Sequence, residues 1–314
     1  MNIKLLDVLA CPKCKGRLWI DAQLAFVKVD DGDMVCEKCG AKYPISGGIP
    51  RFVKSDGYVR SFSLEWARHA RTQLDSVSGL HVAEDTFFER TGFTELDIKG
   101  KLVLDAGCGI GRFMEVAQKH GAHIVGVDMS YSVNQTYENV GKLPNVDIVQ
   151  ADLMNLPFRP GVFDTAFSIG VLHHTSNAEQ AFKNVAALVK DNGKLAVWLY
   201  ANDGLRQRLY NAVAAFYRTF TTRMPQDKLY EVCKCAIPLY EWHRSPFGFL
   251  TRAIMPTSIE PIPEWRVPDT FDWYSPKYQS KHTYRQVESW FIKTGFVNVR
   301  RLSFPTSVTG LKGD

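Results

Sequence analysis

From Lys101 onward, short apolar runs alternate with segments whose apolar residues recur at helical spacing. The apolar runs predict strands, at residues 101–106, 123–128, 146–150, 163–169 and 194–200. The segments between them predict helices, at about 111–120, 131–141 and 178–190. Strand–helix alternation of this kind predicts an α/β fold in which helices cover both faces of a parallel sheet.

Weaker patterns frame this regular region. Near the N-terminus, residues 18–20 and 25–29 alternate loosely, as the two strands of a hairpin would. Near the C-terminus, Thr283-Tyr284-Arg285-Gln286 is a capping box that predicts a helix ending at Thr294, and Phe296 to Leu302 predict one last strand. The chain therefore combines a small N-terminal unit with an α/β domain.

Residues 201–282 interrupt the α/β pattern and are rich in aromatic residues. Within them, an apolar stripe at helical spacing predicts a basic amphipathic helix; it consists of Leu205, Leu209, Val213, Phe216 and Phe220, beside Arg206, Arg208 and Arg218. We expect this stripe to pack against the rest of the protein, although a partner or a membrane surface would also suit it. Residues 271–278 suit a ring-lined acceptor pocket or an interface.

Composition and charge narrow the function classes. Of 314 residues, 45% are hydrophobic and 23% are charged, as in ordinary globular proteins, and the net charge is +5. Nucleic-acid binders usually concentrate more charge, so we do not favour a nucleic-acid partner. No run of about 18 apolar residues predicts a membrane span, and the segment before Cys11 is too short for a signal peptide. We expect a cytoplasmic protein.

Two Cys-x-x-Cys pairs near the N-terminus predict a metal site. Cys11 and Cys14 form the first pair, and Cys36 and Cys39 form the second after 21 intervening residues. Four thiolates are a typical ligand set for structural Zn²⁺, which stabilises units too small to form a sufficient core. Because all four positions would be filled by protein, we predict a structural site and not a catalytic one.

The residues around these cysteines also resemble a known family. Leu5-Leu6-Asp7-Val8-Leu9-Ala10-Cys11-Pro12 and the closing segment Tyr43-Pro44-Ile45-Ser46-Gly47-Gly48-Ile49-Pro50 are similar to the small zinc-ribbon activator protein of tRNA and translation-factor methyltransferases. The resemblance covers about residues 3–53. It implies that a zinc ribbon is fused to a catalytic domain on the same chain.

A glycine-rich turn follows the first predicted strand of the α/β domain. Gly107, Gly109 and Gly111 would let the backbone approach a ligand, and the helix that follows offers free N–H groups to an anion. The G-x-G-x-G spacing differs from that of dinucleotide enzymes. Asp105 would accept from a cationic amine, and Asp128, at the end of the next strand, suits the two hydroxyls of a ribose.

Together with Asp152 after the third strand, this series resembles the class I S-adenosylmethionine methyltransferases over residues 100–200. The resemblance implies a Rossmann-like sheet and S-adenosylmethionine as cofactor. Asp105 and the backbone from Gly107 through Cys108 to Gly109, with Gly111, would hold the methionine part. Asp128 would bind the ribose and Met129 would lie beside the adenine. Asp152 would bind the adenine amine, Leu153 would pack on the ring, and Ile169 would line the site.

Two histidines follow the fourth strand, at the edge predicted to face the transferred methyl group. His173 or His174 could remove a proton from the methyl acceptor, because histidine titrates near neutrality. Similar pairs occur in small-molecule methyltransferases of the family, and also as plain structural elements. The sequence does not rank one histidine above the other.

These observations predict five segments: a zinc ribbon (1–53), a linker with cofactor-covering helices (54–99), a cofactor-binding core (100–200), an acceptor-pocket insertion (201–282) and a C-terminal helix and strand (283–314). They favour methyl transfer to O or N of a small-molecule or lipid- or glycan-linked acceptor. Methylation of tRNA or protein, with the ribbon as built-in activator, and a non-catalytic zinc-ribbon scaffold are the alternatives. The oligomeric state stays open.

Overall fold

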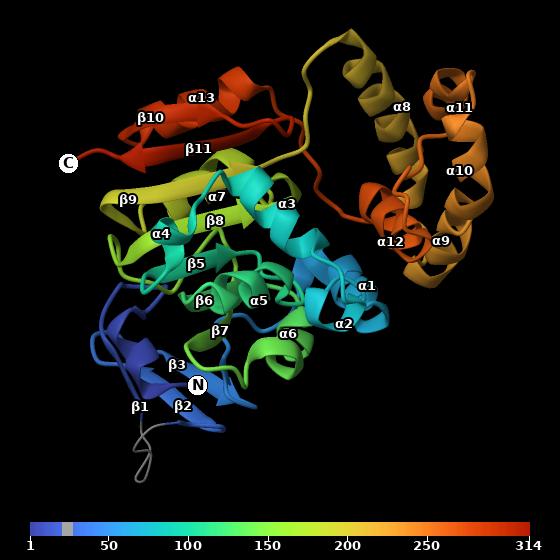
Figure 1. The fold of residues 1–314 in the computed structure, drawn as a ribbon. Coiled ribbons are helices and arrows are strands. Elements are labelled where there is room, and N and C mark those ends of the chain that lie inside the picture. Colours follow the sequence, from blue (N-terminus) through green and yellow to red (C-terminus); the bar gives the residue numbers. More distant parts are fainter. Residues whose placement is uncertain (21–27) are drawn as a thin grey trace.

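The computed structural model describes residues 1–20 and 28–314 and has three parts: a ribbon, a central sheet with helices, and a group of helices at one side (Figure 1). The central sheet has seven strands in the order β10-β11-β9-β8-β5-β6-β7. These are β5 (Leu102–Ala106), β6 (His123–Asp128), β7 (Val146–Gln150), β8 (Phe163–Ile169), β9 (Val189–Trp198), β10 (Phe296–Arg301) and β11 (Ser307–Lys312). β5 to β9 are parallel, and β11 runs antiparallel to both of its neighbours.

Helices cover both faces of this sheet because its central strands are largely apolar, so that successive side chains bury an apolar surface on each face. On one face, Leu104 and Ala106 of β5 pack with α7 (Ala178–Ala186) and α13 (Tyr284–Lys293). On the other face, Val103 packs with α3 (Val82–Thr91), α5 (Arg112–Lys119) and α6 (Ser132–Val140). The predicted Rossmann-like class I α/β fold is thereby confirmed.

The order in which the chain adds strands to the sheet reverses at β5. The chain proceeds from β5 to β6 and β7 on one side, and then returns to β8 and β9 on the other side. Ligands of open α/β sheets bind outside the carboxyl ends of the strands at such a point. The glycine turn after β5 and the histidine pair after β8 therefore lie at the same edge of the sheet.

Two predictions about element boundaries are wrong. The helix predicted to reach residue 190 ends at Ala186, and β9 begins already at Val189, with an irregular register at its start. The apolar pattern of the helix simply continues into Leu188 and Val189 and hides the boundary. After β10 the chain forms a further strand, β11, although the sequence pattern predicts only one strand there.

The ribbon consists of η1 (Ile3–Asp7), β1 (Leu18–Ile20), β2 (Gly32–Cys36), β3 (Lys42–Ser46) and β4 (Ile49–Pro50). It covers β7, the edge strand of the central sheet, through a bridge between Arg51 and Gln150 and a bond from Phe52 N to Gln150 O (2.8 Å). A covered edge cannot pair with other chains. Of the strand predicted at 25–29, residues 25–27 lie outside the described residues.

Short helices link the ribbon to the first strand of the central sheet, β5. They are η2 (Gly57–Val59), α1 (Arg60–Arg68), α2 (Asp75–Ser78), α3 and α4 (Glu95–Ile98). In Figure 1, α1 and α2 lie between the sheet and the group of helices at its side. This placement makes α1 a wall shared by both parts, as its packing against α6 and α12 shows.

The helical insertion comprises α8 (Leu205–Thr221), α9 (Gln226–Cys233), α10 (Ala236–Arg244), α11 (Gly248–Ile254) and α12 (Pro263–Tyr274). It has a small core of its own, made of Leu229, Cys233, Val267, Phe271 and Tyr274. The expectation that the apolar stripe of residues 205–220 packs inward is wrong, because α8 buries no residue and Leu205, Leu209, Phe216 and Phe220 are exposed. No helix in the described part of the chain combines the length and hydrophobicity needed to span a membrane.

Candidate functional site

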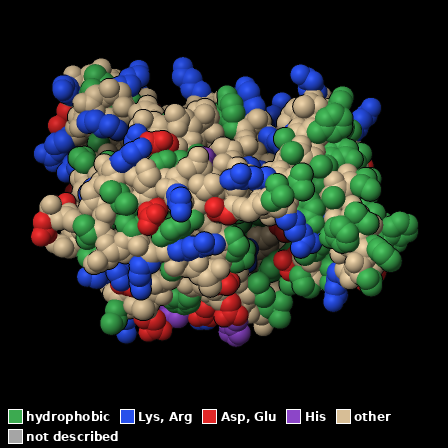
Figure 2. All heavy atoms as spheres, turned by 90° about the horizontal axis from the view of Figure 1, so that it is seen from above, with side chains coloured by type: hydrophobic (Ala, Val, Ile, Leu, Met, Phe, Trp, Pro, Cys, Tyr) green, Lys and Arg blue, Asp and Glu red, His purple; other side chains and the backbone are tan. Residues whose placement is uncertain are grey.

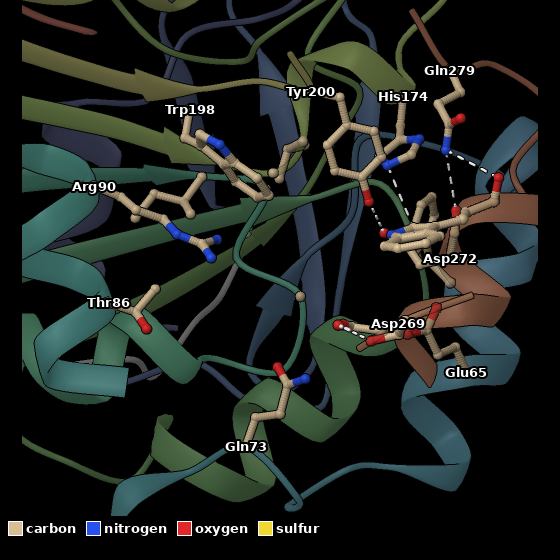
Figure 3. A pocket seen from close by; sticks show the side chains of 18 of the residues that line it. Glu65, Gln73, Thr86, Arg90, His174, Trp198, Tyr200, Asp269, Asp272 and Gln279 are labelled. Carbon is tan, nitrogen blue, oxygen red and sulfur yellow. Dashed lines mark hydrogen bonds and ion pairs between the residues drawn. The ribbon is translucent and has the colours of Figure 1, made fainter. Parts of the chain in front are cut away.

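A cavity of about 690 Å³ opens at the carboxyl ends of the central strands. Its floor is the turn after β5, and its walls come from α1, α3, α8 and α12 and from the segments that follow β8 and β9. Several predicted cofactor residues line it, namely Gly107, Cys108, Gly109, Asp128, Met129, Leu153 and Ile169. Figure 3 shows the opposite end of the cavity, where polar side chains from helices and strands converge.

The glycines of the turn are required by close contacts as well as by conformation. Gly107 and Gly109 have φ of 99° and 53°, in the left-handed region that favours glycine. A Cβ on Gly107 would lie 2.3 Å from a methyl carbon of Val171, so no side chain fits there. Gly111, with φ of 87°, precedes α5 and does not line the cavity. The turn thus exposes backbone to the cavity.

Asp105 lies behind this turn as a buried carboxyl group. Its Oδ2 atom has no hydrogen-bond partner, and burial, reinforced by the nearby Asp128 carboxylate, raises the pKa of Asp105 well above its usual value. A buried carboxyl oxygen without a partner is costly unless a ligand satisfies it. The residues present therefore fit a cofactor that brings a cationic amine to this position.

Asp128 ties the end of β6 to the glycine turn. Its Oδ2 accepts from Gly109 N at 3.0 Å, and its Oδ1 accepts from the backbone and hydroxyl of Ser130 at 2.8 and 2.7 Å. Burial raises the pKa of Asp128, and the hydrogen bonds from Ser130 oppose that rise. Each carboxylate oxygen can accept more than one bond, so the group can still face a diol in the cavity.

The remaining predicted cofactor residues flank Asp128. Met129 and Leu153 line the cavity, whereas Asp152 lies just outside it, where its Oδ1 accepts from the Tyr58 hydroxyl at 2.9 Å and from Met154 N. The thiol of Cys108 is buried, and burial raises its pKa. Seven of the ten predicted cofactor residues therefore line the cavity. The other three, Asp105, Gly111 and Asp152, do not line it themselves.

The two histidines occupy different positions. His174 lines the cavity, and its Nδ1 lies 3.1 Å from the carbonyl oxygen of Tyr278; because a carbonyl only accepts, Nδ1 carries the proton and Nε2 is the basic nitrogen. His173 lies behind it, fully buried, with its ring stacked on Tyr200 at 3.9 Å. Burial lowers the pKa of both histidines, so both are neutral at pH 7.

Asp272 joins His174 to the cavity. Its Oδ2 accepts from the Tyr200 hydroxyl at 2.6 Å, and its Oδ1 lies 3.5 Å from His174 Nε2 (Figure 3). The Asp272 side chain is 22% exposed, whereas that of His174 is only 4% exposed. The Asp272 side chain therefore has more contact with the cavity than that of His174, whereas its Oδ1 atom, like His174 Nε2, is buried and has no hydrogen-bond partner.

Two further carboxyl groups, Glu65 of α1 and Asp269 of α12, lie close to Asp272 (Figure 3). Burial, followed by the charges of Asp272 and Asp269, raises the pKa of Glu65 well above its usual value. Burial and Asp272 likewise raise the pKa of Asp269 to about 7. Like charges so close together cannot all be ionised at neutral pH, so this wall can hold protons.

Arg90 lines the side of the cavity away from these carboxyl groups. Its guanidinium lies between the rings of Trp198 (4.0 Å) and Phe304 (4.3 Å), and its Nε has no hydrogen-bond partner. Stacking on aromatic faces stabilises a guanidinium without a carboxylate partner. The cavity therefore combines an aromatic, cationic side with a carboxyl-rich side.

The four predicted metal ligands form one cluster. The sulfur atoms of Cys11, Cys14, Cys36 and Cys39 all lie within 4.8 Å of one another. Cys11 and Cys39 sulfurs are 3.7 Å apart, and Cys14 and Cys36 sulfurs 3.5 Å apart. A tetrahedron with Zn–S bonds of about 2.3 Å has sulfur–sulfur edges of roughly 3.8 Å. The cluster therefore fits a structural Zn²⁺ ion.

Sequence reasoning missed the carboxyl-rich wall of the cavity. Asp272 lies within the aromatic run that predicts a pocket, but nothing in the run distinguishes it. One signal was present: Asp269 and Asp272 are three residues apart and share a face of α12. The meeting of this face with Glu65 joins segments about 200 residues apart and follows only from the fold.

Comparison with protein families divides the chain in the same way as its structure. Residues 2–48 match the family of Trm112p-like proteins, and residues 104–197 match the methyltransferase-domain family. The chain carries a Trm112p-like domain and a methyltransferase domain. The predicted resemblances at both segments are thereby confirmed, together with S-adenosylmethionine as the cofactor that this fold uses.

Individual relatives match only part of the chain. A ubiquinone biosynthesis O-methyltransferase of Coxiella burnetii is 35% identical over 125 residues, which are 39% of this chain and 53% of the relative. A probable tRNA methyltransferase 9B of Mus musculus is 33% identical over 112 residues, 35% of this chain and 24% of the relative. The matched region thus spans about half the length of the first of these relatives and less of the second.

A solved complex between the Haloferax volcanii Trm112 methyltransferase activator and a putative methyltransferase also resembles the chain. The TM-score is 0.48 at 11% sequence identity, and the match covers 81% of this chain and 98% of the other.

Proposed function

We propose that the whole chain is an S-adenosylmethionine-dependent methyltransferase acting at oxygen or nitrogen of a small-molecule or lipid- or glycan-linked acceptor. The observation that carries the proposal is the partnerless Oδ2 of Asp105 behind a glycine turn that admits no side chain. When bound, the cofactor would supply an electrophilic methyl group, and its sulfur would keep the electron pair of the S–CH₃ bond that breaks. Asp105 and the turn would hold its methionine part, Asp128 its ribose, and Met129, Asp152 and Leu153 its adenine, with Ile169 lining the site.

Asp272 is the proposed proton acceptor. The proton of an acceptor O–H or N–H would pass to the Asp272 carboxylate, while the freed electron pair forms the bond to the methyl carbon. Tyr200 donates to one oxygen of this carboxylate, and neutral His174 faces the other. We assign Tyr200 as a positioning residue, because it donates to Asp272, and His173 supports Tyr200 by stacking. His174 Nε2 and Asp272 Oδ1 are both acceptors without a hydrogen-bond partner, so a proton taken up by Asp272 would lie between them. The remaining alignment of donor and acceptor follows from the shape of the cavity.

The acceptor class is proposed from the cavity and from the relatives. Trp198, Tyr200 and Phe304 give the cavity an aromatic lining that suits an aromatic or other flat acceptor, and Arg90 offers a positive charge. A relative named for O-methylation in ubiquinone biosynthesis agrees with such an acceptor. Because four free thiolates for zinc require reducing conditions, we place this activity in the cytoplasm.

Methylation of tRNA is a second candidate. The Trm112p-like domain and the match to a probable tRNA methyltransferase favour it. The two candidates differ in where the methyl group goes. Incubating the protein with S-adenosylmethionine carrying a tritiated methyl group and a cell extract should label material extractable into organic solvent or small metabolites. Label that enters RNA or protein alone would reject the proposed acceptor class.

The role of Asp272 is tested with that assay. Asp272→Asn should lower turnover by roughly a hundredfold or more, as loss of a general base does. The affinity for S-adenosylmethionine should stay unchanged, because Asp272 does not contact the cofactor residues. Asp203→Asn is the matched control, since Asp203 lies outside the cavity and accepts from Tyr284 N at the start of α13. Full turnover of Asp272→Asn would remove the assignment.

A further inference from the structure

The helix α8 is amphipathic, but unlike an ordinary surface helix it turns its apolar side to solvent and its polar side to the protein. Its exposed side carries Leu205, Leu209, Phe216 and Phe220, which are 57 to 77% exposed. Its opposite side carries polar groups that bond to neighbouring elements: Tyr210 to Phe249 O, Tyr217 to Ile254 O, and Arg218 to Trp273 O and Pro276 O. The apolar stripe is thus held outward by hydrogen bonds on the inner side.

The exposed stripe continues onto α10 and α11. Trp242 of α10, Phe247 before α11, and Phe249, Leu250 and Ile254 of α11 are also exposed. Figure 2 shows these hydrophobic side chains gathered at the side of the molecule formed by α8 to α11, with Lys and Arg side chains among them. We call this set of residues, with the α8 stripe, the apolar surface. Contiguous exposed apolar area of this extent is typical of an interaction site.

The positive charge of the protein is concentrated in the same segment. Residues 205–255 hold 8 of the 38 Lys and Arg residues but only 3 of the 33 Asp and Glu residues, so the rest of the chain is balanced at 30 of each. Neither α8 nor α11 contains an acidic residue. An apolar surface with arginines at its rim complements an anionic lipid bilayer.

Other partners fit this surface less well. A second copy of the chain would bring the same positive charges together, which opposes association. RNA would be attracted by the arginines and would find stacking faces on the exposed rings, but it would leave the aliphatic side chains of Leu205, Leu209 and Ile254 without a partner. A bilayer interface uses both the aliphatic and the cationic groups.

The apolar surface lies next to the cavity. A second hollow, of about 670 Å³, lies between α8 and the α10–α11 segment and is lined by Leu209, Phe249 and Leu250 among others. Tyr210 and Arg252 line both this hollow and the cavity. Tyr210 and Arg252 therefore lie where the hollow meets the cavity, and an amphiphilic molecule with its apolar chain in the hollow would have its polar end beside them.

We propose that the apolar surface binds an anionic membrane and that the acceptor is a membrane lipid, which enters the cavity past Tyr210 and Arg252. The second part rests on the proposed function, whereas membrane binding does not. Phe216 and Phe220 lie outside both hollows, so replacing them changes the surface and leaves the cavity lining intact.

The test uses the full-length protein in flotation assays with vesicles of phosphatidylcholine alone or mixed with phosphatidylglycerol. The wild-type protein should float with the phosphatidylglycerol vesicles, and high salt should weaken this binding. Phe216→Ser with Phe220→Ser should reduce it roughly tenfold or more, because two phenyl groups no longer enter the bilayer. Leu96→Ser is the matched control, since Leu96 is 83% exposed on α4, outside the helical insertion.

A second measurement reports the orientation. Brominated lipids should quench fluorescence in the wild-type protein more than in Trp242→Phe, because Trp242 belongs to the apolar surface. Absence of wild-type binding to anionic vesicles, or equal binding of the Phe216/Phe220 variant, would overturn the proposal. A further contradicting result would be a wild-type protein that binds no vesicles but self-associates or binds RNA, with this activity lost in the Phe216/Phe220 variant. Titration with S-adenosylmethionine separates these outcomes from failure of the proposed function, because it reads the cofactor site alone.

Discussion

At the scale of single residues, Asp105 distinguishes a cofactor site from a structural one. Its carboxyl group is buried, and one of its oxygens has no partner. A group of this kind costs stability in the empty protein and is retained where a ligand needs it.

Replacing Asp105 should therefore separate stability from binding. We expect Asp105→Asn to leave the thermal midpoint unchanged or raise it, and to weaken binding of S-adenosylmethionine roughly tenfold or more, because a charge-assisted contact to the amine is lost. Differential scanning calorimetry and titration calorimetry measure the two effects. If the variant melts earlier but binds the cofactor normally, Asp105 has a structural role only.

Asp269 gives a prediction about pH. Its pKa in the folded protein is about 7, whereas an aspartate in an unfolded chain titrates near 4. Between these values the folded protein holds a proton that the unfolded chain has lost. The contribution of Asp269 to stability is thus present at low pH and is lost as the pH rises through about 7.

Asp269→Asn has no proton to lose there. The free energy of unfolding of this variant should rise relative to that of the wild type between pH 5 and pH 8. Urea denaturation at both pH values measures the difference. Burial lowers the pKa of Lys281 to about 7. Because Lys281 titrates in both proteins, its contribution cancels in the difference between their free energies of unfolding. A difference that does not change with pH would show that Asp269 titrates normally.

At the scale of elements, the ribbon and the sheet depend on each other through β7. The ribbon covers this edge strand and contains the four-cysteine cluster that fits a Zn²⁺ ion. Removing the metal should unfold the ribbon and expose β7, because four thiolates replace the core that so small a unit lacks.

We expect a chelator, or Cys36→Ser, to lower the first melting transition and to increase light scattering on heating, as an exposed sheet edge promotes aggregation. Cys235→Ser is the control, since Cys235 lies in the helical insertion and outside the cluster. Metal analysis should find about one zinc per chain. Metal-free protein with unchanged melting would refute the zinc assignment.

The elements also show what a sequence can predict. The buried parallel strands β5 to β8 follow the predicted runs closely, because strands covered on both faces are continuously apolar. The end of α7 and the start of β9 could not be separated, since Leu188 and Val189 suit either element. β11 was not predicted because Gly310 interrupts a short, partly polar run, and because one of its two partner strands, β9, is distant in the sequence.

At the scale of the whole molecule, the cofactor side of the site could be predicted from the sequence, whereas the acceptor side could not. Residues that hold the cofactor follow successive strands of one sheet, so the chain order itself brings Asp105, Asp128 and Leu153 to one edge. The acceptor wall instead joins α1, the segment after β9, and α12, and Glu65, Tyr200 and Asp272 come together only through tertiary packing. The outward orientation of the α8 stripe likewise depends on hydrogen bonds to distant segments.

The central claim is that the cavity after β5 binds S-adenosylmethionine for methyl transfer. The most direct test is a calorimetric titration of the purified protein with S-adenosylmethionine and with its demethylated product, S-adenosylhomocysteine. The account predicts binding of both in the micromolar range, with the product at least as tight. Absence of binding by either compound would contradict it and would leave a zinc-ribbon scaffold as the better description of the chain.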